Sequence, residues 1–256
     1  MGYGAVLSDT CVTFLDGSTA DLVQKAYPVG RFIVGGFAGG IRNGFILLGD
    51  LQRHLYEPDM TRAWNPEIIA EDWSRNAMMI YENHSDYQKD METHILLTGA
   101  HPTEDAGIPG FAKIIGVIMK SPDFHPEFYF GNMDMYSIGS GNYVDEYLKL
   151  LAEIRKDWPK LIQAEVGKNP GGYARMLDSL VNQAIFENPV PGISSYINHL
   201  IVGRNSLNGG ASKRTDHPPG KEPFVHPRPP VATSWPEFVR MVNAQGTGTK
   251  AESAVG

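Results

Sequence analysis

One stretch of this chain constrains its fold more than any other, because an apolar segment ends on a glycine pair and passes at once into an amphipathic helix. Residues 31–37 predict a short strand, and residues 41–55 predict a helix whose apolar side chains recur at helical spacing. Between them, Gly39 and Gly40 permit a tight turn and a close approach of another chain to the backbone. The turn also leaves a backbone N–H at the end of the strand, which is the donor that an oxyanion hole needs.

The other apolar patterns predict strands, two helices, strands, two helices and a final strand, in that order. Clustered strands and clustered helices favour a layered α+β architecture over alternating βαβ units. The further strands are predicted over residues 4–14, 21–27, 94–99, 111–119, 127–130, 133–138 and 197–202, and the further helices over residues 66–82, 142–158 and 173–186.

The composition changes sharply after Gly203. Residues 208–233 are rich in Gly, Pro, Lys and His and show no apolar periodicity, which is typical of an extended arm. We therefore expect one compact domain over residues 1–203 and a Pro/Gly-rich arm and C-terminal tail over residues 204–256, with a short helix at 235–242 as an option.

Charge and cysteine content argue against several classes of protein. The formal net charge of −7 argues against nucleic acid or an anionic membrane as the principal partner. No apolar run reaches membrane-spanning length, and the first residues lack the basic and apolar segments of a secretory signal, so we expect a cytoplasmic protein. A single cysteine, Cys11, rules out an intrachain disulfide, and the eight histidines form no metal-binding motif, so no metal site is expected.

Four short motifs stand at characteristic intervals. Asp9 ends an apolar strand, and Lys25 follows it by sixteen residues. Gly39 comes fourteen residues after Lys25, and a Gly-Ser-Gly element centred on Ser140 precedes the third predicted helix. Each motif alone is a weak indicator. Together, over roughly residues 4–203, their spacing resembles that of the proteasome β-subunit and HslV family of N-terminal-nucleophile (Ntn) hydrolases.

The resemblance implies a four-layer αββα sandwich with the activity of a threonine-type peptidase that needs no cofactor. In this family the hydroxyl of an N-terminal threonine attacks the peptide carbonyl. Lys25, held by Asp9 in a charge-assisted hydrogen bond, would ease deprotonation of that hydroxyl. The Gly39 N–H would stabilise the oxyanion, and Ser140 would assist proton transfer. The resemblance further implies a homo-oligomeric ring or stacked assembly that acts on peptides or unfolded proteins.

The resemblance also implies residues that bind the substrate. Thr13 and the edge of residues 37–39 would hold an extended peptide by strand addition. Phe37 and Ile41 would line the pocket for the side chain before the scissile bond, and the bulk of Phe37 would favour small or medium apolar residues there. In the simpler interpretation, Phe37 fills the core and Thr13 is an ordinary strand residue.

The nucleophile departs from the family pattern. Counting back sixteen residues from Asp9 places the threonine, and the family's first strand, before Met1. We expect a Thr-led segment upstream; the alternatives are a catalytically inactive assembly subunit of the same fold and an Ntn amidohydrolase for small amides. A nucleophile created by processing before Cys11 would lose Asp9 and is disfavoured. Pro191 or Gly192 stands where the family has a supporting Asp.

The catalytic candidates have structural interpretations as well. Asp9 and Lys25 could form an ordinary surface ion pair, which is common and weak. Ser140 could cap the helix predicted from Asn142, a role that serine fills well.

Overall fold

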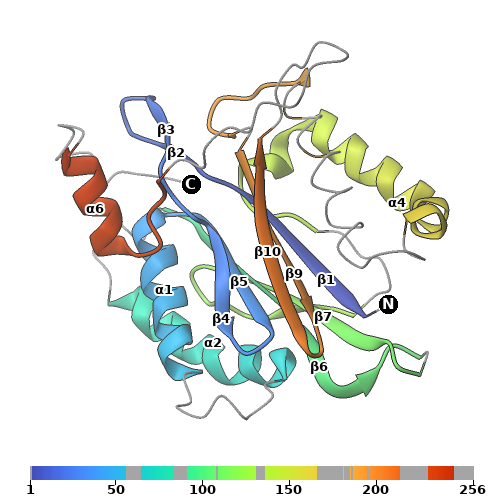
Figure 1. Ribbon diagram of the computed structural model, residues 1–256. Coiled ribbons are helices and arrows are strands. Elements are labelled where there is room, and N and C mark those ends of the chain that lie inside the picture. Colours follow the sequence, from blue (N-terminus) through green and yellow to red (C-terminus); the bar gives the residue numbers. More distant parts are fainter. Residues whose placement is uncertain are drawn as a thin grey trace.

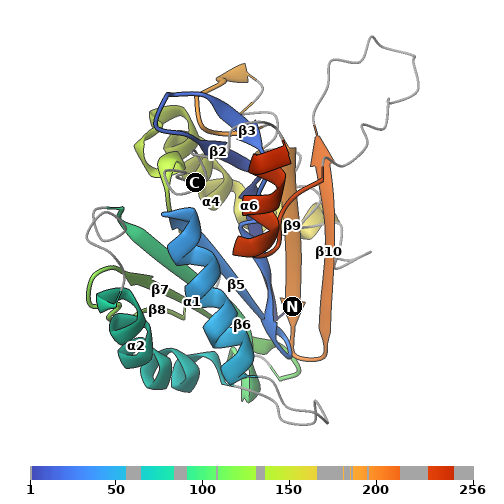
Figure 2. The same cartoon turned by 90° about the vertical axis from the view of Figure 1, so that its left-hand side faces the viewer.

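The computed structural model describes residues 2–55, 65–83, 91–107, 109–130, 136–165, 181, 185, 187–194, 196–213 and 230–244 (Figures 1 and 2). Its strands form three antiparallel sheets with the orders β4-β5-β6-β7-β8, β1-β9-β10 and β2-β3. The strands are β1 (Tyr3–Asp9), β2 (Cys11–Thr13), β3 (Thr19–Asp21), β4 (Ala26–Gly30), β5 (Ile33–Gly39), β6 (Thr93–Asp105), β7 (Ala112–Lys120), β8 (Glu127–Tyr129), β9 (Tyr196–Gly203) and β10 (Ser206–Lys213).

Helices α1 and α2 cover one face of the five-stranded sheet, α1 against β5 and α2 against β6 and β7 (Figure 2). Helix α2 begins where the Asn65 side chain accepts a hydrogen bond from the Glu67 N–H at 3.0 Å, with Pro66 at its first position. The helices are α1 (Ile41–His54), α2 (Pro66–Glu82), α4 (Asp145–Glu165) and α6 (Trp235–Ala244), and a 3-10 turn, η1 (Ser140–Tyr143), precedes α4.

Two apolar cores hold these layers together. The larger core lies between the helices and the five-stranded sheet and includes the buried rings of Phe45 and Trp73. The smaller core lies where the three-stranded sheet packs on the five-stranded sheet, and it joins Val6 of β1 and Val202 of β9 to Val34 of β5. Helices therefore cover a sheet that a second sheet faces on its other side. This arrangement confirms the predicted α+β class.

The strand that the sequence predicts over residues 4–14 is divided at Thr10. The carboxylate of Asp9 accepts a hydrogen bond from the backbone N–H of Cys11 at 2.6 Å, and this local bond turns the chain between β1 and β2. The Asp9 side chain accepts from the backbone N–H two residues later, and the strand ends there although the turn contains no glycine or proline. Alternating apolar residues do not reveal such a break.

Two other predicted elements are only partly visible. Of the strand predicted over residues 133–138, residues 136–138 form neither strand nor helix, and the remainder lies outside the described residues. The helix predicted over 173–186 lies almost wholly outside them. The helix predicted over 142–158 begins later, at Asp145, and continues to Glu165 as α4.

The sequence assigns residues 204–256 to an arm and tail, yet two parts of this segment pack on the body of the fold. The short helix offered for residues 235–242 is present as α6. β10 pairs with β9 along its whole length, from Ser206 opposite Gly203 to Lys213 opposite Tyr196. Helix α6 inserts Phe238, which is fully buried, into the larger core. Residues 206–213 and 235–244 thus belong to the same structural unit as the strands before them.

Candidate active site

The ion pair between Asp9 and Lys25 ties the two sheets together. Asp9 ends β1 of the three-stranded sheet, and Lys25 stands just before β4 of the five-stranded sheet. The Lys25 Nζ lies 2.9 Å from the Asp9 Oδ1, and the two side chains are 6% and 20% exposed. An ion pair withdrawn from water to this degree differs from the weak pairs of protein surfaces, because neither charge can be left unpaired without a large penalty.

The glycine turn lies at the end of β5, the strand that pairs with β4, and Lys25 directly precedes β4. The backbone N–H of Phe37 donates to the carbonyl of Lys25 at 3.0 Å, so the chain at Lys25 runs beside the last residues of β5. Gly39 has a φ of +92°, and a Cβ on it would stand 1.8 Å from the carbonyl oxygen of Glu92. Only glycine fits this backbone. The turn that the sequence singles out is therefore a structural requirement, close to the charged pair.

The Gly-Ser-Gly element lies against the same strand end. Gly139 has a φ of +83°, and a Cβ on it would lie 2.8 Å from the Cβ of Ala38. Ser140 follows as the first residue of η1, with an exposed side chain. The amide of Asn142 donates to the carbonyl of Ser137 at 2.9 Å, and its side-chain oxygen contacts the Ser137 hydroxyl, which closes this loop on itself. Because α4 begins only at Asp145, Ser140 caps no helix at Asn142.

Tyr147 of helix α4 is a further polar residue whose pKa responds to Asp9. Burial raises the pKa of its phenol, and the nearby Asp9 carboxylate raises it further. The hydroxyl donates to the carbonyl of Asn188 at 2.9 Å, so it stays a protonated donor. Sequence reasoning missed this residue, because nothing in the helical pattern distinguishes Tyr147 from its aromatic neighbour Tyr143.

Cys11 follows Asp9 by two residues, and its side chain stays a neutral thiol. Burial and the Asp9 carboxylate raise its pKa to about 11, while Lys25 acts in the opposite direction. A thiol with such a pKa carries almost no thiolate at neutral pH, and the thiolate is the nucleophile.

The residues predicted to bind substrate fall into two groups. Phe37 is 3% exposed, with its ring 5.2 Å from that of Phe45 in an edge-to-face contact, and Ile41 is fully buried in the same core. Both occupy positions typical of core side chains, and their role toward a substrate stays a prediction. Thr13 lies in β2, where a Cβ on Gly192 would lie 3.0 Å from its Oγ1. Thr13 therefore adjoins Gly192, one of the two positions at which the resemblance implies an Asp.

The described part of the chain contains no group of three or more His, Cys, Asp or Glu side chains that could hold a metal ion. No helix within the described ranges is long and apolar enough to cross a bilayer. Comparison of the sequence with models of known protein families and with curated proteins yields no match.

Proposed function

We propose that this chain is a subunit of a proteasome-like Ntn hydrolase that cleaves peptide bonds with an N-terminal threonine supplied by a segment before Met1. The observation that carries the proposal is the buried Asp9–Lys25 pair at 2.9 Å beside a strand end whose φ demands glycine. A fully surface-exposed pair would favour the structural interpretation instead. The contact of Gly139 with Ala38 supports the inclusion of Ser140 in the same site.

The layer order supports the finer fold that this proposal requires. Helices α1 and α2, the five-stranded sheet and the three-stranded sheet supply three consecutive layers. The proposed αββα sandwich adds α4 as the fourth layer. In that arrangement the family's first strand would continue the three-stranded sheet next to β1.

The proposed reaction passes through an ester. The threonine hydroxyl oxygen attacks the peptide carbonyl carbon while its proton passes to the terminal amine, and the Lys25 ammonium stabilises the developing alkoxide. The Gly39 N–H donates to the oxyanion of the tetrahedral intermediate. Collapse of the tetrahedral intermediate breaks the C–N bond, and the terminal ammonium gives its proton to the departing amine. An acyl ester remains on the threonine. Water then attacks the ester carbonyl and loses a proton to the terminal amine. The C–O bond to the threonine breaks, the acid is released, and the proton passes back to the threonine oxygen to restore the hydroxyl.

A homo-oligomeric ring or stack belongs to the same proposal. Ile68 and Met79 of α2 leave 55% and 47% of their surface exposed, and large apolar side chains in such positions support contacts between subunits. The mass of the native particle in solution, measured by light scattering, tests this part. A monomer at micromolar concentration would contradict it.

The test of the activity uses the full protein from its natural source, including any residues that precede Met1. Mass spectrometry defines its mature N-terminus, and release of a fluorophore from a peptide amide measures hydrolysis. We expect an N-terminal threonine, and we expect Lys25→Ala to lower the rate by at least about a hundredfold. Lys113→Ala is the matched control, because Lys113 of β7 makes a 2.8 Å ion pair with the exposed Glu104 of β6. Its rate should equal that of the parent.

Two results would contradict this function. If the mature chain begins with a residue that has no hydroxyl or thiol and hydrolyses no peptide, the fold serves as an inactive assembly subunit. If Lys25→Ala retains the full rate, the ion pair is structural. Hydrolysis of small amides without hydrolysis of peptides would instead favour the amidohydrolase alternative.

A further inference from the structure

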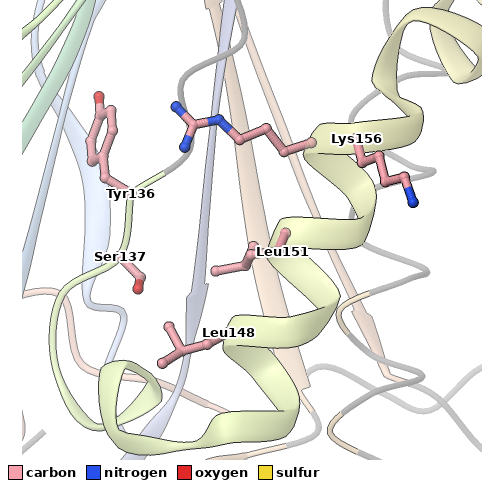
Figure 3. A pocket seen from close by; sticks show the side chains of 7 residues that line it. Tyr136, Ser137, Leu148, Leu151 and Lys156 are labelled. Atoms are coloured by element: carbon pink, nitrogen blue, oxygen red, sulfur yellow. The ribbon is translucent and has the colours of Figure 1, made fainter.

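A pocket of about 530 Å³ lies between helix α4 and the segment that holds Tyr136 and Ser137 (Figure 3). Two of its polar side chains, Tyr136 and Arg155, already interact with other groups of the protein. The amine of a third, Lys156, points away from the pocket in Figure 3. Buried polar groups that lack a partner lie elsewhere, between the two larger sheets.

Two polar side chains there have buried atoms that no hydrogen bond reaches. They are Ser8 of β1 and Asn198 of β9, which stand directly opposite each other in the antiparallel register. Asn198 is 4% exposed. Within the described part of the chain, neither its amide nitrogen nor its amide oxygen has a hydrogen-bond partner, and the Ser8 hydroxyl oxygen has none either. Native proteins rarely leave such atoms unpaired.

The alternation of the strands turns both side chains toward the five-stranded sheet. Side chains two residues apart on a strand share a face. Val6 stands two residues before Ser8, and Leu200 stands two residues after Asn198. Val6 belongs to the smaller core between the sheets, and Leu200 packs against that core (Figure 2). Ser8 and Asn198 therefore continue an apolar row with polar groups.

The facing sheet leaves more room at this end of β1 than at the other. A Cβ on Gly4, near the beginning of β1, would lie 2.7 Å from the Thr98 Cγ2 of the facing sheet. Ser8 lies at the opposite end, directly before the residue that pairs with Lys25. A Cβ on Gly36, which lies beside Lys25, would have its three nearest atoms at 3.6–3.8 Å, and none of these belongs to the three-stranded sheet. A small molecule fits better at the Lys25 end.

The unpaired atoms define the chemistry of the ligand. The Asn198 nitrogen donates, the Asn198 oxygen accepts, and the Ser8 hydroxyl can do either. A metal cation would satisfy the acceptors alone, and an anion would satisfy the donors alone. An uncharged molecule that both donates and accepts satisfies all of them, and water is the smallest such molecule. Buried waters typically make about three hydrogen bonds to groups of this kind.

We propose that Ser8 and Asn198 form an internal hydration site, which holds about one or two water molecules between the two sheets. Water accepts a hydrogen bond from the Asn198 Nδ2 and donates to the Asn198 Oδ1 and the Ser8 Oγ. The site is independent of the proposed function, because it belongs to the packing of the sheets whatever reaction the protein catalyses.

A crystal structure of the full protein at atomic resolution tests the site directly. We expect a spherical density peak at about 2.7–3.2 Å from the Asn198 Nδ2 or Oδ1, and a peak at the same range from the Ser8 Oγ. In solution, the Asn198 side-chain amide protons should show cross-relaxation with water, with the sign that marks a long-lived water molecule.

Oxygen-17 relaxation dispersion counts the long-lived waters and assigns them to these residues. Asn198→Leu should lower the amplitude by the equivalent of about one water molecule. Ser8→Ala is the milder variant and should lower the amplitude or shorten the residence time. Asn208→Leu is the matched control, because Asn208 is an exposed asparagine on β10 of the same sheet, and it should leave the amplitude unchanged.

Three results would overturn the hydration site. One is a direct hydrogen bond between the Asn198 amide and the Ser8 hydroxyl, with no density peak beside them. Another is a peak whose oxygen contacts are about 2.3–2.6 Å, because such distances identify a bound cation. The third is an equal dispersion amplitude in the parent and in Asn198→Leu. If Asn198→Leu does not fold, an amplitude and residence time in Ser8→Ala equal to those of the parent have the same meaning.

Discussion

The Cβ of Ala38 lies 2.8 Å from the point where a Cβ on Gly139 would stand. This contact joins the end of β5 to the loop that carries Ser140, two segments separated in the chain by α1, α2 and three strands. Any side chain at position 139 would push the two apart. The loop that carries Ser140 can therefore approach the end of β5 only because Gly139 has no side chain.

Substitution of the glycines by alanine should give a graded series of stabilities. Gly39→Ala meets a backbone oxygen at 1.8 Å and a φ of +92°, so we expect a loss of more than about 2 kcal/mol. Gly17→Ala, with a φ of +78° and open space around it, should lose only about 1 kcal/mol. Gly49→Ala, within α1 and equally open, should gain about 0.5–1 kcal/mol.

Urea denaturation measures the three free energies of unfolding. The Gly17 variant isolates the cost of the backbone angle, and the Gly49 variant reports helix propensity alone. If Gly39→Ala were as stable as Gly17→Ala, the contact with Glu92 would be relieved by a small backbone shift, and the rigidity of the turn would be refuted.

Removal of Lys25 should destabilise the fold because it leaves the Asp9 carboxylate without its partner. Since Asp9 keeps 20% of its surface exposed, we expect Lys25→Met to cost about 2–3 kcal/mol, below the range for completely buried pairs. Asp9→Asn in the same chain should recover part of the loss. A double-mutant cycle in urea measures the coupling, which we expect to exceed about 1 kcal/mol; additive effects would show that the pair is solvent-screened.

The thiol of Cys11 gives a pH-dependent signal of the same site. Its pKa rises from 9.0 to about 11 in the fold through burial and Asp9. Between these values the unfolded chain loses the proton first, so this group's contribution to stability is complete below pH 9.0 and is lost as the pH rises through about 11. Alkylation by iodoacetamide at about pH 8 should therefore be much slower in the folded protein than in concentrated urea.

Asp9→Asn should accelerate that alkylation, because it removes a negative charge that opposes the thiolate and leaves Lys25 to favour it. Cys11 is the single cysteine of the chain, so intact mass reports its modification without ambiguity. An equal rate in Asp9→Asn and in the parent would show that Asp9 exerts no field at the sulfur.

Helix α6 should be as necessary to stability as the central helices. Phe238 is fully buried, and Phe238→Ala should cost about 3–4 kcal/mol through lost burial and the cavity that remains. Leu15→Ala, at a side chain that is 72% exposed, should change stability by less than about 0.5 kcal/mol. Urea denaturation distinguishes them; a mild effect at Phe238 would mean that α6 docks loosely.

Local sequence signals predicted the helices and strands whose ends are marked by particular residues in the sequence. Helix α2 spans the predicted residues 66–82, because Asn65 and Pro66 mark its beginning and Ile69, Trp73 and Ala77 repeat on one face. Strand β10 could not be found in this way. Its sequence has two adjacent glycines, Gly209 and Gly210, and no apolar alternation, and it is a strand because β9 pairs with it.

The same distinction applies to the candidate site. The meeting of Asp9 and Lys25 followed from their interval and the family resemblance, and their hydrogen bond agrees with it. The effect of the Asp9 carboxylate on the pKa of Tyr147 could not be predicted, because it depends on the tertiary placement of α4. The burial of Phe37 on the helix side likewise depends on tertiary packing, since Phe45 and Gly44 receive its ring.

The backbone of Ala232 is bonded on both sides of Val23: its N–H donates to the Leu22 carbonyl at 2.7 Å, and its carbonyl accepts from the Gln24 N–H at 2.9 Å. These bonds immediately precede Lys25. During synthesis, residue 232 leaves the ribosome long after the strands it completes. The segment that leads into Lys25 consequently acquires these two bonds only after residue 232 has emerged, and nascent chains halted earlier lack them.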